Sequence, residues 1–303
     1  MDILGTLQLG FIYSILALGI FVSFRVMNMP DLTVDGSFTL GLCVSAMAVL
    51  SGHPLLGFML SFICGAAAGV ITGLLQTKVG IHPLLAGILT MTGLYSINLA
   101  VMRGSPNVSL LRTDTFFSIL RKIFPAVDRG VLSLAAVAVI CVLCLGALTW
   151  FFRTGLGLRV RAAGDNAAMV RASSINSDGI RVLANALTNA FVGLSGAVLA
   201  QYQGYADINS GAGVIVVGLA SIIIGEVVIR KQTVFSGLLA SALGAVAYRL
   251  LIALALYAKF FPAYMLKLVS AIIVVATLAI PKIREMSRNA KIRRRGQGNV
   301  RPG

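Results

Sequence analysis

An uncharged apolar run opens the chain: residues 7–24 read LQLGFIYSILALGIFVSF. As an α-helix this run would be about 27 Å long, close to the thickness of a bilayer's hydrocarbon core. Eight further apolar runs follow it. They are Ser37–Leu50, Leu55–Leu75, Leu84–Val101, Val131–Phe152, Val182–Gln201, Val214–Ile229, Val234–Tyr257 and Ala263–Ile280. The sequence therefore predicts an all-α fold, a polytopic membrane bundle of about nine transmembrane helices in which the second and seventh are short.

The composition excludes the usual soluble classes. Hydrophobic residues make up 58% of the 303 residues, charged residues only 12%, and the mean hydropathy is +0.93, whereas soluble domains are about 25% charged. The net charge is +15. No aromatic residues are interleaved with the basic ones, so the lipid bilayer, and not nucleic acid, is the expected partner of this charge.

The basic residues also predict an orientation. With the C-terminus in the cytoplasm and nine spans, 17 Lys and Arg residues fall in cytoplasmic segments and 7 in external ones, while Arg249 lies within a span. Such an excess is typical of the cytoplasmic side. We therefore expect an external N-terminus, a transmembrane domain over residues 1–281, and a disordered basic cytoplasmic tail over 282–303. The polar segment Met102–Gly130 is expected outside, with a short amphipathic helix.

Two polar stretches resemble each other and predict a repeat. Asp31–Gly36 reads DLTVDG and follows the first span, while Asp207–Gly213 reads DINSGAG and follows the sixth. Each ends a long span and opens a short one. The two spans run in opposite senses in the predicted orientation, so the halves would be inverted. Inverted repeats with interrupted helices are typical of transporters.

The loop between the fifth and sixth spans, residues 155–178, carries the most specific pattern. Residues 161–168 read RAAGDNAA, and residues 171–176 read RASSIN. Asp165 or Asn166 is a suitable N-cap, which predicts a short exposed helix over Ala167–Ser173, and Asn176 begins a second cap. This pattern resembles the coupling loop of permeases of the branched-chain amino acid and ribose type. Ser174, Met169 and Val170 depart from the family's usual glycine and alanines.

The first half resembles the same family, in residues 10–19 (GFIYSILALG) and 29–37 (MPDLTVDGS). The resemblance implies a type II-like permease subunit of an ATP-binding-cassette (ABC) importer in the bacterial plasma (inner) membrane. It implies a homodimer, an extracytoplasmic solute-binding protein or lipoprotein, and two ATPase subunits docked on the loops. The implied cargo is a small organic solute, with an amino acid among the candidates, and no cofactor is expected. The implied coupling residues are Arg161, Gly164, Asp165, Asn166, Arg171, Ile175 and Asn176.

Polar side chains inside the spans are candidates for the translocation path or gate, because they are costly in lipid and usually face the bundle interior. Asn185 and Asn189 share one helix face, and hydrogen bonds between helices are the alternative to substrate contact. Asp31 and Asp35 either cap the second helix or form a gate. The full set is Asp31, Asp35, Thr90, Thr92, Asn98, Asn185, Asn189, Gln201, Asp207 and Asn209.

Other function classes were weighed against an ATP-driven permease. No G-x-x-x-x-G-K-[ST] phosphate loop occurs, so ATP hydrolysis is expected on a separate subunit. An intramembrane enzyme would need a positioned base or metal ligands, and neither histidine lies in a span, so the sequence predicts neither catalytic nor metal-binding residues. An ion-coupled secondary transporter is the remaining alternative. It would usually need an acid near mid-membrane, and all ten acids are expected in loops or near span ends.

Overall fold

The computed structural model describes residues 3–166, 169–170, 176–229 and 233–257, together with positions 268, 271, 272 and 275. Within this part of the chain, seven helices are long and apolar enough to cross a membrane, and one further apolar helix is shorter. The predicted all-α membrane bundle is therefore confirmed. The count of nine is not, because the ninth predicted span lies almost wholly outside the described residues, as does the basic tail.

Eight predicted spans coincide with helices. The seventh is short, as expected, whereas the second is an 18-residue helix long enough to cross a membrane. The eight helices are α1 (Ile3–Phe21) with its π-helical extension η1 (Val22–Val26), α2 (Thr33–Leu50), α3 (Pro54–Thr77), α4 (Pro83–Val101), α6 (Arg129–Arg153), α9 (Ser177–Gln203), α10 (Val214–Val228) and α11 (Val234–Tyr257). Local chemistry sets several starts. Proline begins α3 and α4, where its missing N–H costs nothing, and the side chains of Asp128 and Asn176 cap α6 and α9.

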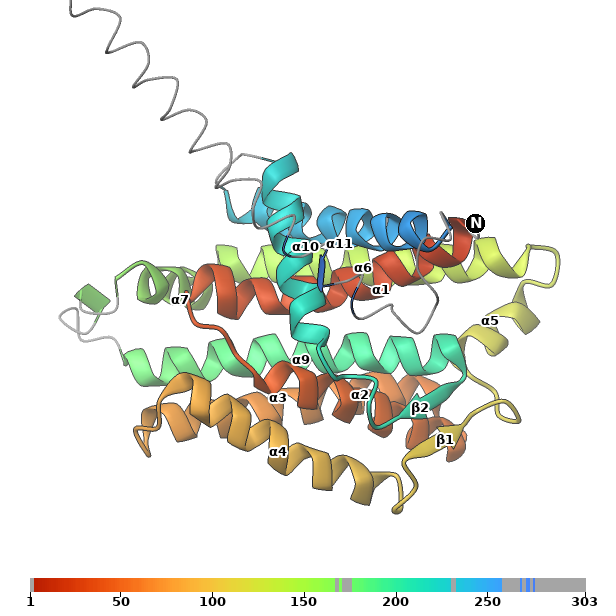
Figure 1. Cartoon of the computed structure of the whole chain (residues 1–303), viewed down its shortest axis with the longest axis horizontal. Coiled ribbons are helices and arrows are strands. Elements are labelled where there is room, and N and C mark those ends of the chain that lie inside the picture. Colours follow the sequence, from red (N-terminus) through yellow and green to blue (C-terminus); the bar gives the residue numbers. More distant parts are fainter. Residues whose placement is uncertain are drawn as a thin grey trace, which may run out of the picture.

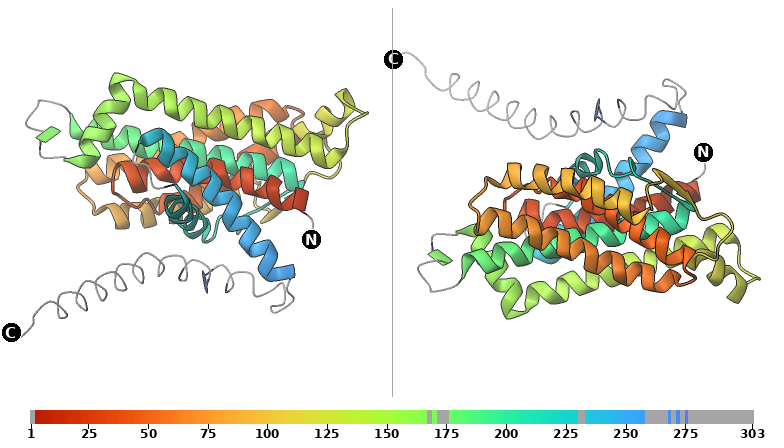
Figure 2. Two further views of the ribbon diagram at one scale, coloured as in Figure 1. Left: turned by 90° about the horizontal axis from the view of Figure 1, so that it is seen from above. Right: turned by 90° about the horizontal axis from the view of Figure 1, so that it is seen from below.

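Most of the long helices run side by side along the bundle (Figure 1), while α11 crosses them obliquely (Figure 2). Helix α9 is central: it packs against α2 and α3 on one side and against α1 on the other. Helix α4 covers α2, while α6 and α11 flank α1. Helix α10 runs steeply across the others and packs on α11 and α1 (Figure 1). The described part of the chain is thus built around α9 and α1.

Small residues let these helices approach closely. A Cβ on Gly41 of α2 would overlap the backbone of Gly193 on α9, and one on Gly65 of α3 would overlap the carbonyl of Asn189. In lipid, where apolar burial between helices drives little, such close backbone contact is a main source of helix association. The glycines therefore fix α2 and α3 against α9.

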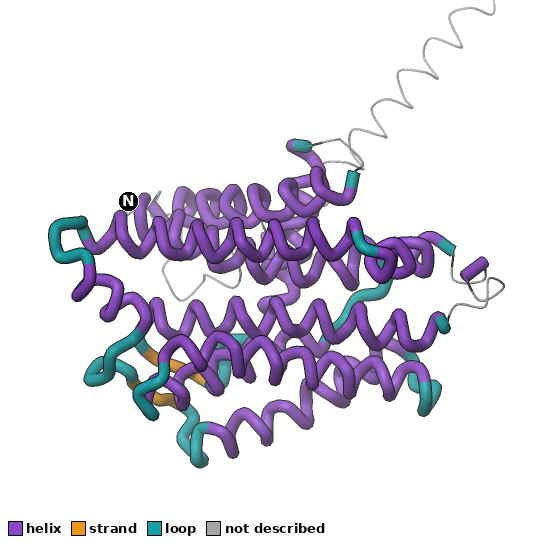
Figure 3. The backbone as a smooth tube through the Cα atoms, turned by 180° about the vertical axis from the view of Figure 1, so that it is seen from behind, coloured by secondary structure: helices purple, strands orange, loops and turns teal. Residues whose placement is uncertain are grey.

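The two ends of the bundle differ (Figure 3). One end, called here the strand end, holds the amphipathic helix α5 (Phe116–Ile123) and an antiparallel pair of strands, β1 (Asn107–Ser109) and β2 (Tyr205–Asp207). The short helix was expected in this segment, but the strands were not. The opposite end, called the α7 end, holds α7 (Gly155–Asp165). The helix expected at Ala167–Ser173 lies mostly outside the described residues.

Candidate functional site

Asp31 lies at the middle of the bundle. Its Oδ2 accepts a 2.6 Å hydrogen bond from Nδ2 of Asn189, which lies halfway along the 27 residues of α9. Its Oδ1 accepts from the backbone N–H of Thr33 at 2.9 Å, in the first turn of α2. The side chain is 2% exposed. Asp31 lies in the loop between η1 and α2, so it is a loop residue as expected. This loop, however, turns back into the bundle and does not lie at its edge.

Asp35 also differs from its predicted capping role. Although it lies in the first turn of α2, its carboxylate accepts hydrogen bonds from the backbone N–H groups of Gly213 and Ile215, at 2.8 and 2.9 Å. It therefore caps the start of α10, where the helix dipole favours a negative charge. The two polar stretches that resemble each other in the sequence meet at this point. Both connect a long helix to a shorter one, as predicted, while the inverted relation of the halves stays a prediction.

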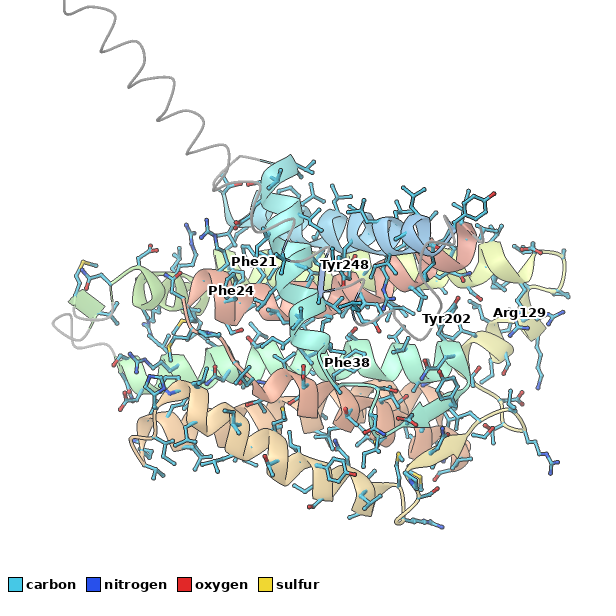
Figure 4. The ribbon with its side chains drawn as sticks, viewed as in Figure 1. Phe21, Phe24, Phe38, Arg129, Tyr202 and Tyr248 are labelled. Carbon is cyan, nitrogen blue, oxygen red and sulfur yellow. The ribbon has the colours of Figure 1, made fainter. Side chains whose placement is uncertain are left out.

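A pocket of about 370 Å³ opens beside this contact. It is lined by α2, by one face of α4 and by the segment before α10, and is called here the α4–α10 pocket. Figure 4 shows Phe38, one turn beyond Asp35, at the level where α10 begins. The pocket unites four of the predicted path residues with several that were not predicted. Its polar lining residues are Asp35, Thr39, Thr92, Tyr95, Asn98 and Asn209, joined by Met91.

The remaining predicted path residues lie elsewhere. Asn185 donates to Oε1 of Gln76 on α3 at 3.0 Å, and Thr90 donates to the carbonyl of Ala86 on its own helix. Gln201 joins α9 to Ser45 and to the backbone of Pro54 and Phe116. Asp207 belongs to the β1–β2 pair, where Asn107 donates to it at 3.4 Å. Asn185 and Asn189 therefore form hydrogen bonds between helices and along α9.

The predicted coupling residues that the structure describes meet the inner helices at the α7 end. A Cβ on Gly164 would overlap the carbonyl oxygen of Val26 in η1, and Nδ2 of Asn28 donates to the carbonyl of Gly164 at 3.3 Å. Asn28 itself has a φ of 53°, a left-handed conformation that asparagine tolerates better than most residues. Helix α7 therefore rests directly on the turn that leads to Asp31.

A second pocket, of about 610 Å³, lies beside this contact. Arg161 and Asp165 line it, together with the ion pair between Arg25 and Glu226, whose Nε and Oε1 atoms are 2.7 Å apart. Asn166 accepts from the N–H of Met169 at 3.0 Å, as expected of an N-cap. Asn176 caps α9. Arg171 and Ile175 lie outside the described residues.

The comparisons decide the family. Residues 3–278 match the model of the family described as branched-chain amino acid transport system, permease component. The chain belongs to this family.

Named relatives agree with the assignment. The permease is 36% identical over 278 residues to the tyrosine transport system permease protein of Clostridioides difficile (strain R20291), covering 91% of this chain and 90% of that one. It is 35% identical over 229 residues to an uncharacterized protein of Rickettsia prowazekii (strain Madrid E), with 75% and 78% covered. An autoinducer 2 import system permease protein, LsrC of Enterobacter sp. (strain 638), is 27% identical over 205 residues, with 67% and 57% covered. No solved structure matches the chain.

Membership fixes the class of function. The family and the relatives with a named function are permease components of transport systems, so this permease is an integral membrane transport subunit and not itself an enzyme. It is a multi-pass protein of the inner membrane, with several apolar helices long enough to cross it.

Sequence reasoning missed several residues of the permease that the structure brings to these sites. Tyr95 and Met91 lie on the same face of α4 as Asn98. Tyr95 follows Met91 by four residues and Asn98 follows it by seven, a helical spacing from which both could have been predicted. Away from these sites, Arg249 was recognised in the sequence as lying within a span, but its partner was not: its guanidinium carbon lies 3.8 Å from the centre of the Tyr13 ring. This cation–π contact joins α11 to α1 across about 236 positions of sequence, and no local pattern announces it.

Proposed function

We propose that the permease is the membrane-spanning subunit of an ABC importer that carries an amino acid into the cytoplasm. In this proposal the strand end faces outward and receives the solute from a binding protein, while the α7 end faces the cytoplasm and receives an ATPase subunit. Two permease chains would form the transport path between them. The match over most of the chain to a tyrosine transport system permease makes tyrosine the first solute to test.

One observation carries the mechanical part of the proposal: Gly164 of α7 lies against Val26 without room for a side chain between them. A displacement of α7 by an ATPase would therefore act on η1 directly. From η1 the chain runs within a few residues to Asp31, which is bonded to the centre of α9. Asp35 follows one turn later and holds the start of α10. A short run of the chain, from Val26 to Asp35, thus links the α7 end to the centre of α9 and to the start of α10.

An ion-coupled transporter would usually need an acid near the middle of the membrane. Asp31 and Asp35 lie at the middle of the bundle, so this alternative must be considered again. However, Asp31 is bonded to Thr33 and Asn189, and Asp35 caps α10. Both carboxyl groups therefore have structural roles that need no proton or sodium cycle. Together with the family, this supports coupling to ATP.

The test is uptake in proteoliposomes. The permease would be coexpressed and purified with a candidate ABC ATPase from the same genome, and supplied with a candidate binding protein and labelled tyrosine. We expect uptake that requires internal ATP and survives collapse of proton and sodium gradients. Uptake driven by either gradient without ATP would contradict the proposal, as would a permease that copurifies with no ATPase.

A further inference from the structure

The α4–α10 pocket contains hydrogen-bond acceptors that lack donors. Asn98 is 1% exposed, and its Nδ2 donates to the carbonyl of Gly36 at 3.3 Å. Because that carbonyl can only accept, the NH₂ group must face it and Oδ1 must point away. This Oδ1 is buried without a partner. A buried acceptor without a donor is destabilising, so a donor that reached this oxygen through a small movement of the Asn98 side chain would be stabilised.

Asp35 brings a negative charge to the same pocket. The backbone N–H groups of Gly213 and Ile215 donate to its two oxygens, and a carboxylate has roughly four acceptor positions. Among the residues that the structure describes, no lysine or arginine nitrogen lies within 4 Å of it. The side chain is half-buried and lines the pocket. The pocket therefore offers a carboxylate and an amide oxygen with no cation between them.

We propose that the α4–α10 pocket is a substrate subsite that binds the ammonium group of an amino acid through Asp35 and Oδ1 of Asn98. An ammonium group has three donors and no acceptor, which matches the unpartnered Oδ1 of Asn98 and the unused acceptor positions of Asp35. It also carries the positive charge that Asp35 lacks nearby. This inference rests on the proposed function, and it adds the position at which the solute is held and the group that is recognised.

The opposite orientation of the solute fits less well. A helix start is a common site for an anion, and a carboxylate could be expected at α10. Here the N–H groups of Gly213 and Ile215 already donate to Asp35, and the N–H groups of Val214 and Val216 are used within the turn. A solute carboxylate would find no free donor there and would be repelled by Asp35.

The remaining wall suits a large side chain. Tyr95 is 53% exposed, and Met91 lies one turn from it on α4. An aromatic ring and a flexible thioether are adaptable partners for another ring. The volume of about 370 Å³ lies in the range of small-molecule sites. The pocket therefore pairs a polar end for the ammonium with an apolar wall for the solute's side chain.

The test measures protection of a cysteine in the pocket and does not depend on uptake. The four native cysteines, Cys43, Cys64, Cys141 and Cys144, are replaced by alanine in the full chain, Thr92→Cys is introduced, and the chain is placed in lipid nanodiscs. The rate of labelling by N-ethylmaleimide, a neutral reagent, is measured with tyramine, with 3-(4-hydroxyphenyl)propionate, or with NaCl at equal concentration. Tyramine keeps the ammonium group of tyrosine and lacks its carboxylate, while the propionate has the reverse.

We expect tyramine to slow the labelling at least threefold, and the propionate and NaCl to leave it unchanged. Asp35→Asn should abolish the protection, while Gly93→Ala, a change on α4 beside the labelled position with open space around it, should retain it. Since Asp35→Asn also weakens a cap, Asn98→Leu serves as a second variant, in a chain that stays monodisperse. It should raise the tyramine concentration needed for half-maximal protection about tenfold.

Equal protection by both organic compounds, protection by NaCl alone, or no protection at all would overturn the subsite. So would full protection in folded Asp35→Asn or Asn98→Leu protein. Failure of tyrosine uptake in proteoliposomes would instead contradict the proposed function while the labelling result stands, so the two failures are distinguishable.

Discussion

At the scale of single residues, the Asp31–Asn189 pair is the best-defined polar contact in the interior. Asn189 uses its Nδ2 twice, toward Asp31 at 2.6 Å and toward the carbonyl of Asn185 at 2.9 Å. Thr33 adds a second tie, because its hydroxyl lies 2.8 Å from that of Thr72 on α3. Helices α2, α3 and α9 are thus joined at one depth by side chains whose partners lie far apart in the sequence.

Asn189→Leu should destabilise the permease by about 3 kcal/mol, because it leaves a buried carboxyl group short of a donor. The measurement is the free energy of unfolding in a titration with sodium dodecyl sulfate. Adding Asp31→Asn to the Asn189→Leu variant replaces the carboxyl group that has lost its donor. The double variant should therefore lose less stability than the sum of the single variants, and strict additivity would show that the pair does not interact.

At the scale of elements, the bounds of the helices were predictable and their depth was not. Apolar runs mark where α3, α4, α6 and α11 begin and end, since lipid requires such runs. The polar sequence before α2 predicts a position at the membrane edge, but Asp31 lies inside the bundle. It can lie there because Thr33 and Asn189, and not water, donate hydrogen bonds to its carboxylate. Strands β1 and β2 are three residues each and pair across about 100 positions, so no local pattern announces them.

The candidate site was predictable in its residue types and less so in its grouping. Thr92 and Asn98 stood out as polar residues in apolar helices, and the structure brings them together with Asp35 and Asn209. Gln201 stood out for the same reason, yet its bonds fix the ends of three helices. A polar residue in a membrane bundle can either bind neighbouring helices together or line a translocation path. Only the positions of its neighbours distinguish these two roles.

Helix α7 offers a matched pair of substitutions for the coupling hypothesis. Gly164→Ala would place a methyl group against the carbonyl of Val26, whereas Gly155 has nothing within 4 Å of the added Cβ. Both changes favour the helix intrinsically, so a loss in one alone reports the contact. In the reconstituted importer we expect Gly164→Ala to raise the ATP consumed per solute about tenfold. Equal ratios in Gly164→Ala and Gly155→Ala would contradict a route from α7 to η1.

At the scale of the whole molecule, function depends on which end faces the cytoplasm. An ATPase can reach only one side of the membrane, and the proposed route starts at α7, while the strands and α5 lie at the far end of the bundle (Figure 1). The distribution of Lys and Arg favours the α7 end as the cytoplasmic one, although much of that excess lies in the tail. The orientation therefore decides whether an ATPase can reach the start of the proposed route.

Cysteines placed at the two ends measure the orientation. In a chain without Cys43, Cys64, Cys141 and Cys144, Ser105→Cys lies in an exposed turn at the strand end and Arg159→Cys on the exposed side of α7. We expect a membrane-impermeant maleimide to label the first in intact cells and the second only after the membrane is permeabilised, because a charged reagent does not cross the hydrocarbon core. The reverse pattern would place α7 outside the cell, where no ATPase could press on it, and the proposed coupling would be wrong.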